Sequence, residues 1–217
     1  MSRVHTAVLC RGFAGAKRRL APVLAPAERA VLARAMLADV LSALAAAPGI
    51  AGIAVVSGDP AVAGFAAARG VVVVDDPAPA GPSTAAALAA RAFPEALLVL
   101  PADIPLARPG EIVELLTAVA RPPAVALAAA AGDGGTNALA AAPSDAIPFA
   151  FGERSLARHR ALADERGLSP TVLSLPGLGR DLDRPADLAA FLARPSPTRT
   201  FAALTRMGVP ARLGRAA

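Results

Sequence analysis

The sequence predicts an α/β protein whose mostly parallel sheet carries helices on both faces. Short apolar runs alternate along the chain with longer segments of helical periodicity. The run Val71–Val74 has no polar alternation, which is typical of a strand covered by helices on both faces. Strand–helix–strand units are right-handed and build parallel sheets, in which ligands bind at the carboxyl ends of the strands.

The first half of the chain predicts three strands and three helices. A strand over 4–10 ends at a Gly-containing loop, and Pro26 then opens a helix that stops at Pro48-Gly49. In this helix Leu37, Leu41 and Leu44 share one apolar face. The other elements are strands over 50–57 and 71–74 and helices over 60–69 and 83–92, the last with Ser83 as its N-cap.

The second half continues the alternation. Strands are expected over 97–100, 124–131 and 171–175, and helices over 109–119, 152–166 and 185–192; the segments 75–82 and 132–136 are expected to be loops. No repeat or linker divides the chain, so residues 1–195 are expected to form one domain. Residues 196–217 are expected to be a tail with one short peripheral helix over 198–207. The oligomeric state is open.

Composition excludes several classes of protein. With 55% hydrophobic and 18% charged residues, the chain does not have the composition of a disordered protein. Every apolar run is interrupted before about 20 residues, so no membrane span is expected. Residues 2–6 lack the charged and apolar regions of a signal peptide, and the single cysteine, Cys10, excludes a disulfide framework. We therefore expect a cytoplasmic protein.

The positive charge does not predict nucleic-acid binding. The net charge is +5, but the arginines are spread along the chain and there is no Trp or Tyr to stack on bases. Lys17 is the single lysine among 22 basic residues, and it lies in the Gly-containing loop after the first strand. Two interpretations stay open for Lys17: a compact cation that contacts phosphate, or a surface residue that has survived by chance.

Three aspartates lie where strands are expected to end. Asp103 follows a buried strand, where a carboxylate is costly unless a cation pairs with it. Asp181 and Asp183 are two residues apart and point the same way in an extended segment. Together the three offer the hard oxygen ligands that suit Mg²⁺. The alternative is that Asp183 caps the following helix and Asp181 pairs with an arginine.

Two further groups of residues could bind anions. Gly12, Gly15 and Lys17 resemble a phosphate cradle without matching a known phosphate-loop fingerprint. Hydroxyl groups and free amides gather at Thr136, Asn137, Gly152 and Ser155, and Ser155 shares a helical face with His159. His159 could equally have a structural role. The sequence shows no nucleophile–His–acid arrangement.

Several segments occur in an order that resembles a known family. They are 16–22 (AKRRLAP), 101–106 (PADIPL), 135–139 (GTNAL), Phe151-Gly152 with Ser155 and His159, and 181–188 (DLDRPADL). Together they resemble the 2-phospho-L-lactate / phosphoenolpyruvate guanylyltransferases of coenzyme F420 biosynthesis over roughly residues 4–192. The resemblance implies a single-domain, Rossmann-like nucleotidyltransferase fold of the GT-A type, which is a three-layer α/β sandwich.

The resemblance also implies an activity and a set of roles. GMP passes from GTP to a phosphorylated three-carbon acid (phosphoenolpyruvate, 2-phospho-L-lactate or 3-phosphoglycerate), and pyrophosphate leaves. Lys17 and Asp103 are the expected catalytic residues, and Asp103, Asp181 and Asp183 are the expected Mg²⁺ ligands. The expected nucleotide-binding residues are Arg11, Gly12, Lys17, Arg19, Gly81, Ser83, Pro101 and Ala102. The expected acid-binding residues are Thr136, Asn137, Gly152, Ser155 and His159.

The chain departs from the family pattern at two places. Arg11 stands where the family commonly has Lys, and Gly81-Pro82-Ser83 replaces a Gly-Leu-Asn segment near the nucleotide. The guanine preference and the identity of the acid therefore stay open. Two alternatives remain: an enzyme of the same fold with another acceptor, or a nucleotide-binding protein without catalysis.

Overall fold

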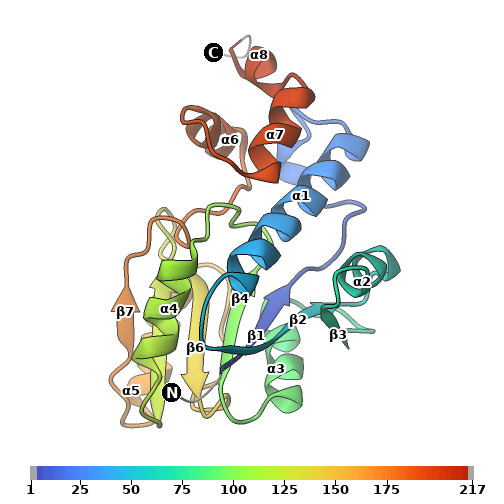
Figure 1. Ribbon diagram of the computed structural model, residues 1–217. Helices are drawn as coiled ribbons and strands as arrows, with labels where there is room; N and C mark the ends of the chain where they lie inside the picture. The colour runs from blue at the N-terminus through green and yellow to red at the C-terminus, as the bar shows by residue number, and fades with distance from the viewer. Residues whose placement is uncertain (1–3, 215–217) are drawn as a thin grey trace.

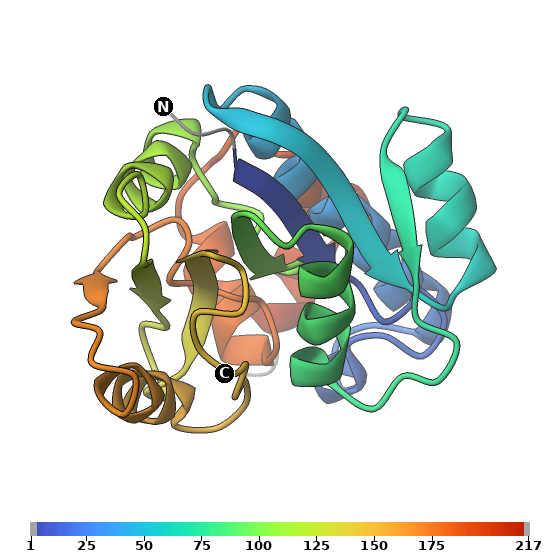
Figure 2. The same cartoon turned by 90° about the horizontal axis from the view of Figure 1, so that it is seen from below.

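A seven-stranded mixed sheet forms the centre of the protein in the computed structural model, which describes residues 4–214 (Figure 1). The strand order is β3-β2-β1-β4-β6-β5-β7, and β3 and β7 lie at opposite edges (Figure 2). The four strands β3, β2, β1 and β4 share one direction and the β5–β7 pair is also parallel, whereas β6 runs antiparallel to both of its neighbours. The strands are β1 (Val4–Leu9), β2 (Ile50–Ser57), β3 (Val72–Asp75), β4 (Leu97–Pro101), β5 (Ala124–Ala129), β6 (Thr136–Ala142) and β7 (Thr171–Leu173).

Helices cover both faces of the sheet, as the sequence predicts. One face carries α1 (Pro26–Ala45), α2 (Pro60–Ala67) and α4 (Pro109–Ala118). The other carries α3 (Pro82–Ala92) and α5 (Ser155–Asp164). The remaining elements are η1 (Arg18–Leu20), α6 (Pro185–Leu192), α7 (Arg199–Arg206) and α8 (Val209–Leu213).

Alternate residues of the central strands enter opposite cores. Leu98 and Leu100 of β4 pack with the α1 side, whereas Leu97 and Val99 pack with α3. All four are fully buried, so β4 is apolar on both faces. The three-layer sandwich that the resemblance implies is therefore present. None of the helices between residues 4 and 214 has the length and apolarity needed to cross a membrane.

The sequence analysis missed β6, and this strand matters for the site. Its residues are all buried, and they pair with β4 on one side and β5 on the other. Because β6 runs antiparallel to β4, its first residue, Thr136, lies at the edge where the parallel strands end. The segment is rich in alanine, which has little strand propensity, so its strand conformation depends on the two neighbouring strands.

Three boundaries differ from the sequence predictions. Gly81, with φ +117°, is the N-cap of α3 because Pro82 occupies the first turn; Ser83 was therefore wrongly predicted as the cap. The charged helix begins at Ser155, after a turn at Gly152. The tail forms two helices because Gly208, with φ +68°, interrupts it; α7 packs beside α1, and α8 packs beside α6 and α7 (Figure 1).

Candidate active site

A cavity of about 650 Å³ opens at the carboxyl edge of the parallel strands. Strand ends and the loops that follow them supply its walls, as expected for an open α/β sheet. Its acidic residues include Asp76, Asp103 and Asp181, and its cationic residues are Arg11, Arg19 and Arg184. The other lining residues are Leu9, Cys10, Val56, Pro79, Gly81, Pro82, Ala85, Val99, Leu100, Pro101, Asp133, Gly135, Thr136, Asn137, Phe151, Gly152, Glu153 and Ser155.

The loop after β1 is held in place by buried contacts. Asp59 accepts the N–H of Phe13 at 2.9 Å, and a Cβ on Gly12 would come within 2.8 Å of the same carboxylate oxygen. Arg29 of α1 donates to the carbonyl oxygens of Ala16 and Leu24. Glycine at position 12 therefore lets this loop lie close to the end of β2, with Arg11 at the cavity.

Lys17 is the centre of an ion cluster below the cavity. Its Nζ lies 2.5 Å from Asp103 Oδ2 and 2.6 Å from Asp183 Oδ1, and 8% of its side chain is exposed. Arg19 donates to the other oxygen of Asp183 at 3.2 Å. Burial alone would lower the pKa of Lys17, but the two carboxylates outweigh it and raise the pKa above its ordinary value. The ammonium is therefore charged at neutral pH.

The pKa values of two carboxylates in the cluster are shifted in opposite directions. Burial would raise the pKa of Asp183, but the Lys17 charge outweighs it and holds that pKa below its ordinary range. Burial, and then the nearby charge of Asp103, raise the pKa of Asp181. Asp103 Oδ1 is buried with no hydrogen-bond partner in residues 4–214. Asp103 thus has one oxygen on Lys17 and one without a partner, whereas both oxygens of Asp183 bind cations.

Thr136, at the start of β6, and Ser155, at the start of α5, bring two hydroxyl groups to the cavity. Ser155 Oγ accepts the N–H of Thr136 at 2.8 Å. Thr136 Oγ1 lies 3.0 Å from His159 Nδ1, and His159 Nε2 accepts the N–H of Ala150 at 2.9 Å. A neutral imidazole with an accepting Nε2 carries its proton on Nδ1, so it donates to Thr136. Each hydroxyl oxygen accepts one bond and keeps its own proton to donate to a ligand.

His159 supports this end of the cavity without lining it. The side chain is fully buried under Thr136, and its ring packs edge-on against Phe151 at 5.1 Å. Burial, followed by the charge of Arg158, lowers the pKa of His159 to about 4. The ring is therefore neutral at physiological pH, which the bond from Ala150 requires.

The segment 177–183 is fixed by a buried carboxylate from α4. Glu111 accepts the N–H groups of Gly177 and Leu178 at 2.8 and 3.0 Å. The amide of Asn137 donates to Leu178 O at 2.9 Å, so this part of Asn137 serves the loop although the residue lines the cavity. These bonds set the position from which Asp181 reaches the cavity.

The structure brings most of the predicted residues to one cavity. Those that line it are Arg11, Arg19, Gly81, Pro101, Asp103, Thr136, Asn137, Gly152, Ser155 and Asp181. Those that do not line it are Gly12, Lys17, Ser83, Ala102, His159 and Asp183. Ser83 instead accepts the N–H of Phe151 at 2.9 Å, which links α3 to the loop before α5. The sequence analysis gave no role in the site to Asp76, Arg184, Phe151 or Glu153, which also line the cavity.

The fold is shared with solved structures of other proteins. The chain is similar to the solved structure of a nucleotidyl transferase from Methanothermobacter thermautotroptrophicus, with a TM-score of 0.61 and 20% identity over 88% of this chain and 96% of that one. It is also similar to the structure of a CMP:2-keto-3-deoxy-manno-octonic acid synthetase complexed with CTP, with a TM-score of 0.59 and 14% identity over 88% of this chain and 97% of the other. The likeness to both structures shows that they share the three-layer fold.

Sequence similarity shows that the chain is a nucleotidyltransferase and assigns it to one family. Residues 6–216 match the model of the family described as "Guanylyl transferase CofC like". A 3-phospho-D-glycerate guanylyltransferase from Phenylobacterium zucineum is 40% identical over 204 residues, which cover 90% of this chain and 92% of the relative. A phosphoenolpyruvate guanylyltransferase from Sphaerobacter thermophilus is 42% identical over 177 residues, covering 80% and 84%. The chain belongs to the CofC-like guanylyl transferase family.

Proposed function

We propose that this protein transfers GMP from GTP to a phosphorylated three-carbon acid and releases pyrophosphate, in the cytoplasm and as a step of coenzyme F420 biosynthesis. The observation that carries the proposal is the division of one cavity into three parts. Arg11 and Arg19 lie at one part, the carboxylates of Asp103 and Asp181 at the next, and the hydroxyls of Thr136 and Ser155 at the last, in the order of the strands β1, β4 and β6.

The reaction needs no protein nucleophile. A phosphate oxygen of the acid attacks the α-phosphorus of GTP, the bond from that phosphorus to the bridging oxygen breaks, and pyrophosphate takes the bonding electrons. Burial raises the pKa of the nearby Cys10 thiol to about 12, so the thiol stays protonated. The protein contributes alignment and charge neutralisation, which dominate phosphoryl-type transfers.

The residues divide this work between the two substrates. Arg11 and Arg19 neutralise the triphosphate on the nucleotide side. On the acid side, the hydroxyl protons of Thr136 and Ser155 point toward the oxygens of the acid, because each hydroxyl oxygen already accepts a bond. Gly152, with φ +115°, turns the chain beside them and leaves room for the ligand.

A divalent cation, which we propose to be Mg²⁺, fits the donor set only in part. Asp103 has a buried oxygen without a partner, and Asp181 adds a second carboxylate. Among residues 4–214, however, no three acidic, His or Cys side chains are arranged to share an ion. Two carboxylates suit Mg²⁺, which takes its other ligands from water and substrate phosphates. When bound, the ion neutralises phosphate charge; Asp183 instead holds Lys17 beside Asp103.

Pyrophosphate release tests the proposal. The purified protein is assayed with GTP and Mg²⁺ and, separately, with phosphoenolpyruvate, 2-phospho-L-lactate and 3-phosphoglycerate, with ATP, CTP and UTP as nucleotide controls. Release with GTP and one of the acids is expected, and it identifies the acid. Folded protein that binds GTP but releases no pyrophosphate with any of the three acids contradicts the proposal.

A further inference from the structure

The mechanism above leaves one buried carboxylate at the cavity unused. Asp76 lines the cavity from the segment after β3, and 6% of the residue is exposed. Within residues 4–214 its carboxylate has no hydrogen-bond or ion-pair partner, yet its oxygens are not sealed in the interior as Asp103 Oδ1 is. A buried anion without a partner is costly, so its donors are expected to come from a ligand in the cavity.

The backbone of Asp76 is fixed before any ligand arrives. Its N–H donates to Ser57 O at 3.3 Å, where β2 ends. Its carbonyl lies so close to Gly58 that a Cβ there would come within 2.2 Å of the oxygen. A glycine at position 58 therefore lets the segment press against the end of β2, which preorganises the carboxylate.

The walls near Asp76 are apolar. Val56 precedes Ser57, whose carbonyl oxygen accepts the N–H of Asp76, and Pro79 lies beside Gly58. Both line the cavity, as do Leu9, Pro82 and Ala85. Apolar walls around a single buried acceptor suit a flat heteroaromatic ring with polar hydrogens on one edge, and they suit a sugar or a phosphate poorly.

Topology places Asp76 at the far end from the reacting phosphorus. Asp76 follows β3, the edge strand, and Asp103 follows β4, three strands away. Neighbouring strands are about 4.8 Å apart, so the two strand ends are separated by roughly 14 Å. A nucleotide with its α-phosphate near Asp103 therefore directs its base toward Asp76.

From these observations we infer that Asp76 recognises the guanine base by accepting hydrogen bonds from N1–H and the 2-amino group. This inference rests on the proposed use of GTP. Guanine presents two adjacent donors, which match the two oxygens of a carboxylate. Adenine and cytosine present one amino group beside a ring acceptor, and uracil presents one N–H between two carbonyls. Asp76 can thus provide the guanine preference although the family's Gly-Leu-Asn segment is replaced at 81–83.

The test is an exchange of nucleotide specificity in Asp76→Asn. An asparagine amide offers one acceptor and one donor, so it matches xanthine, whose 2-oxo group replaces the 2-amino group of guanine. At a saturating concentration of the phosphorylated acid, kcat/KM of the variant for GTP is expected to fall at least about 10²-fold, mainly through KM. Its kcat/KM for XTP is expected to rise above its kcat/KM for GTP. Titration calorimetry with GDP and XDP should show the same exchange without turnover.

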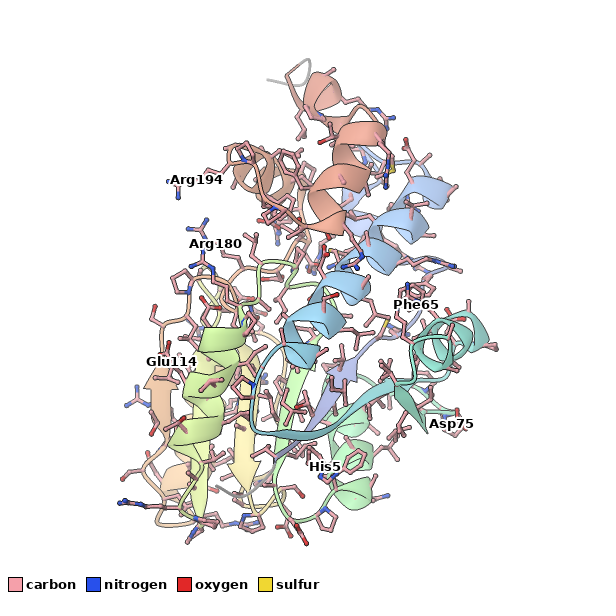
Figure 3. All side chains as sticks on the ribbon, in the orientation of Figure 1. His5, Phe65, Asp75, Glu114, Arg180 and Arg194 are labelled. Carbon is pink, nitrogen blue, oxygen red and sulfur yellow. The ribbon has the colours of Figure 1, made fainter. Side chains whose placement is uncertain are left out.

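The matched control is Asp75→Asn, the same change one residue earlier. Asp75 is exposed at the outer edge of β3 (Figure 3) and does not line the cavity, so the Asp75→Asn protein should keep the GTP preference of the wild type. If Asp76→Asn keeps the preference for guanine over xanthine, the inference is overturned. An equal loss for GTP and ATP, with no binding of XDP, also overturns it and indicates a contact with ribose. Wild-type protein that binds GDP in preference to XDP but transfers no GMP contradicts the proposed function alone.

Discussion

A single lysine joins the two carboxylate-bearing segments of the site. Lys17 has a left-handed backbone, φ +52°, which costs a non-glycine residue about 1–2 kcal/mol, and its ammonium binds Asp103 and Asp183. In Lys17→Met both carboxylates lose this cation and repel each other. We expect the free energy of unfolding to fall by about 1–3 kcal/mol and kcat by at least about 10²-fold.

Urea unfolding and pyrophosphate release measure these two effects. Arg19→Met is the control for stability, because Arg19 makes one contact with Asp183 at 3.2 Å and 67% of its side chain is exposed. Its unfolding free energy should change by less than about 1 kcal/mol. Equal destabilisation by the two variants would show that the buried ammonium has no special role.

His159 predicts a pH dependence of stability. The pKa of His159 is about 4 in the folded protein, against 6.5 for an ordinary histidine. Between pH 6.5 and pH 4 this histidine is protonated in the unfolded chain but not in the folded protein. Stability therefore falls as the pH drops from 6.5 to 4, and the effect levels off below pH 4. The loss attributable to this residue is roughly 3 kcal/mol.

The variant His159→Gln can keep a donor and an acceptor but cannot titrate. Urea unfolding between pH 7 and pH 4 should show a shallower loss of stability in the variant than in the wild type. Parallel curves for the two proteins would mean that His159 is not held neutral as the bonds to Thr136 and Ala150 require.

At the scale of single residues, the sequence predicted which residues lie at the site better than it predicted what each of them contacts. Asp103 and Thr136 could be selected because polar residues at strand ends meet at one edge of the sheet. That Asp183 binds Lys17, and that His159 lies beneath Thr136, depends on contacts across 166 and 23 residues. No local pattern encodes such partners. Asp76 was visible as a carboxylate after a strand, but its burial was not.

At the scale of elements, periodicity found the strands of the parallel part and missed β6. Runs such as Val71–Val74 stand out because β-branched residues are strong strand formers. The β6 segment TNALAAA has no such signal, and it becomes a strand because β4 and β5 offer it two partners. Sequence therefore predicted a parallel sheet correctly for most of its width, but not the strand that begins with Thr136.

The link between α4 and the segment 177–183 gives a prediction at this scale. Glu111 accepts two buried N–H groups, and an amide in its place would direct its own N–H at one of them. Glu111→Gln should lower the unfolding free energy by about 1–3 kcal/mol, and kcat should fall because Asp181 loses its fixed position. Pyrophosphate release and urea unfolding test both effects. Glu114→Gln, on the exposed face of the same helix (Figure 3), should change neither.

At the scale of the whole molecule, the fold class followed from the alternation of strands and helices, whereas the packing of the tail did not. The sequence analysis expected the tail to be peripheral and left the oligomeric state open. Leu204 is fully buried in the core, and Phe201 packs against Phe191 of α6. The sequence could not resolve this because Asp39, the residue that holds the tail, is 160 positions away from it.

Asp39 therefore allows stability to be separated from catalysis. This buried carboxylate of α1 accepts the N–H groups of Arg199 and Thr200 and the Thr200 hydroxyl, at 2.7–2.9 Å. In Asp39→Asn at least one of these donors loses its acceptor, so the unfolding free energy should fall by about 1–3 kcal/mol. Hydrogen exchange of the α7 amides should accelerate for the same reason.

Catalysis should survive this change, because none of the residues 185–214 lines the cavity. We expect kcat and KM for GTP within about twofold of the wild type at a temperature where the variant is folded. Ser42→Ala, which removes an exposed bond from Arg199 and a bond to Ala38 O within α1, is the matched control and should leave α7 exchange unchanged. A large loss of kcat in Asp39→Asn, with the fold intact, would mean that the tail helices reach the reaction by a route other than the cavity wall.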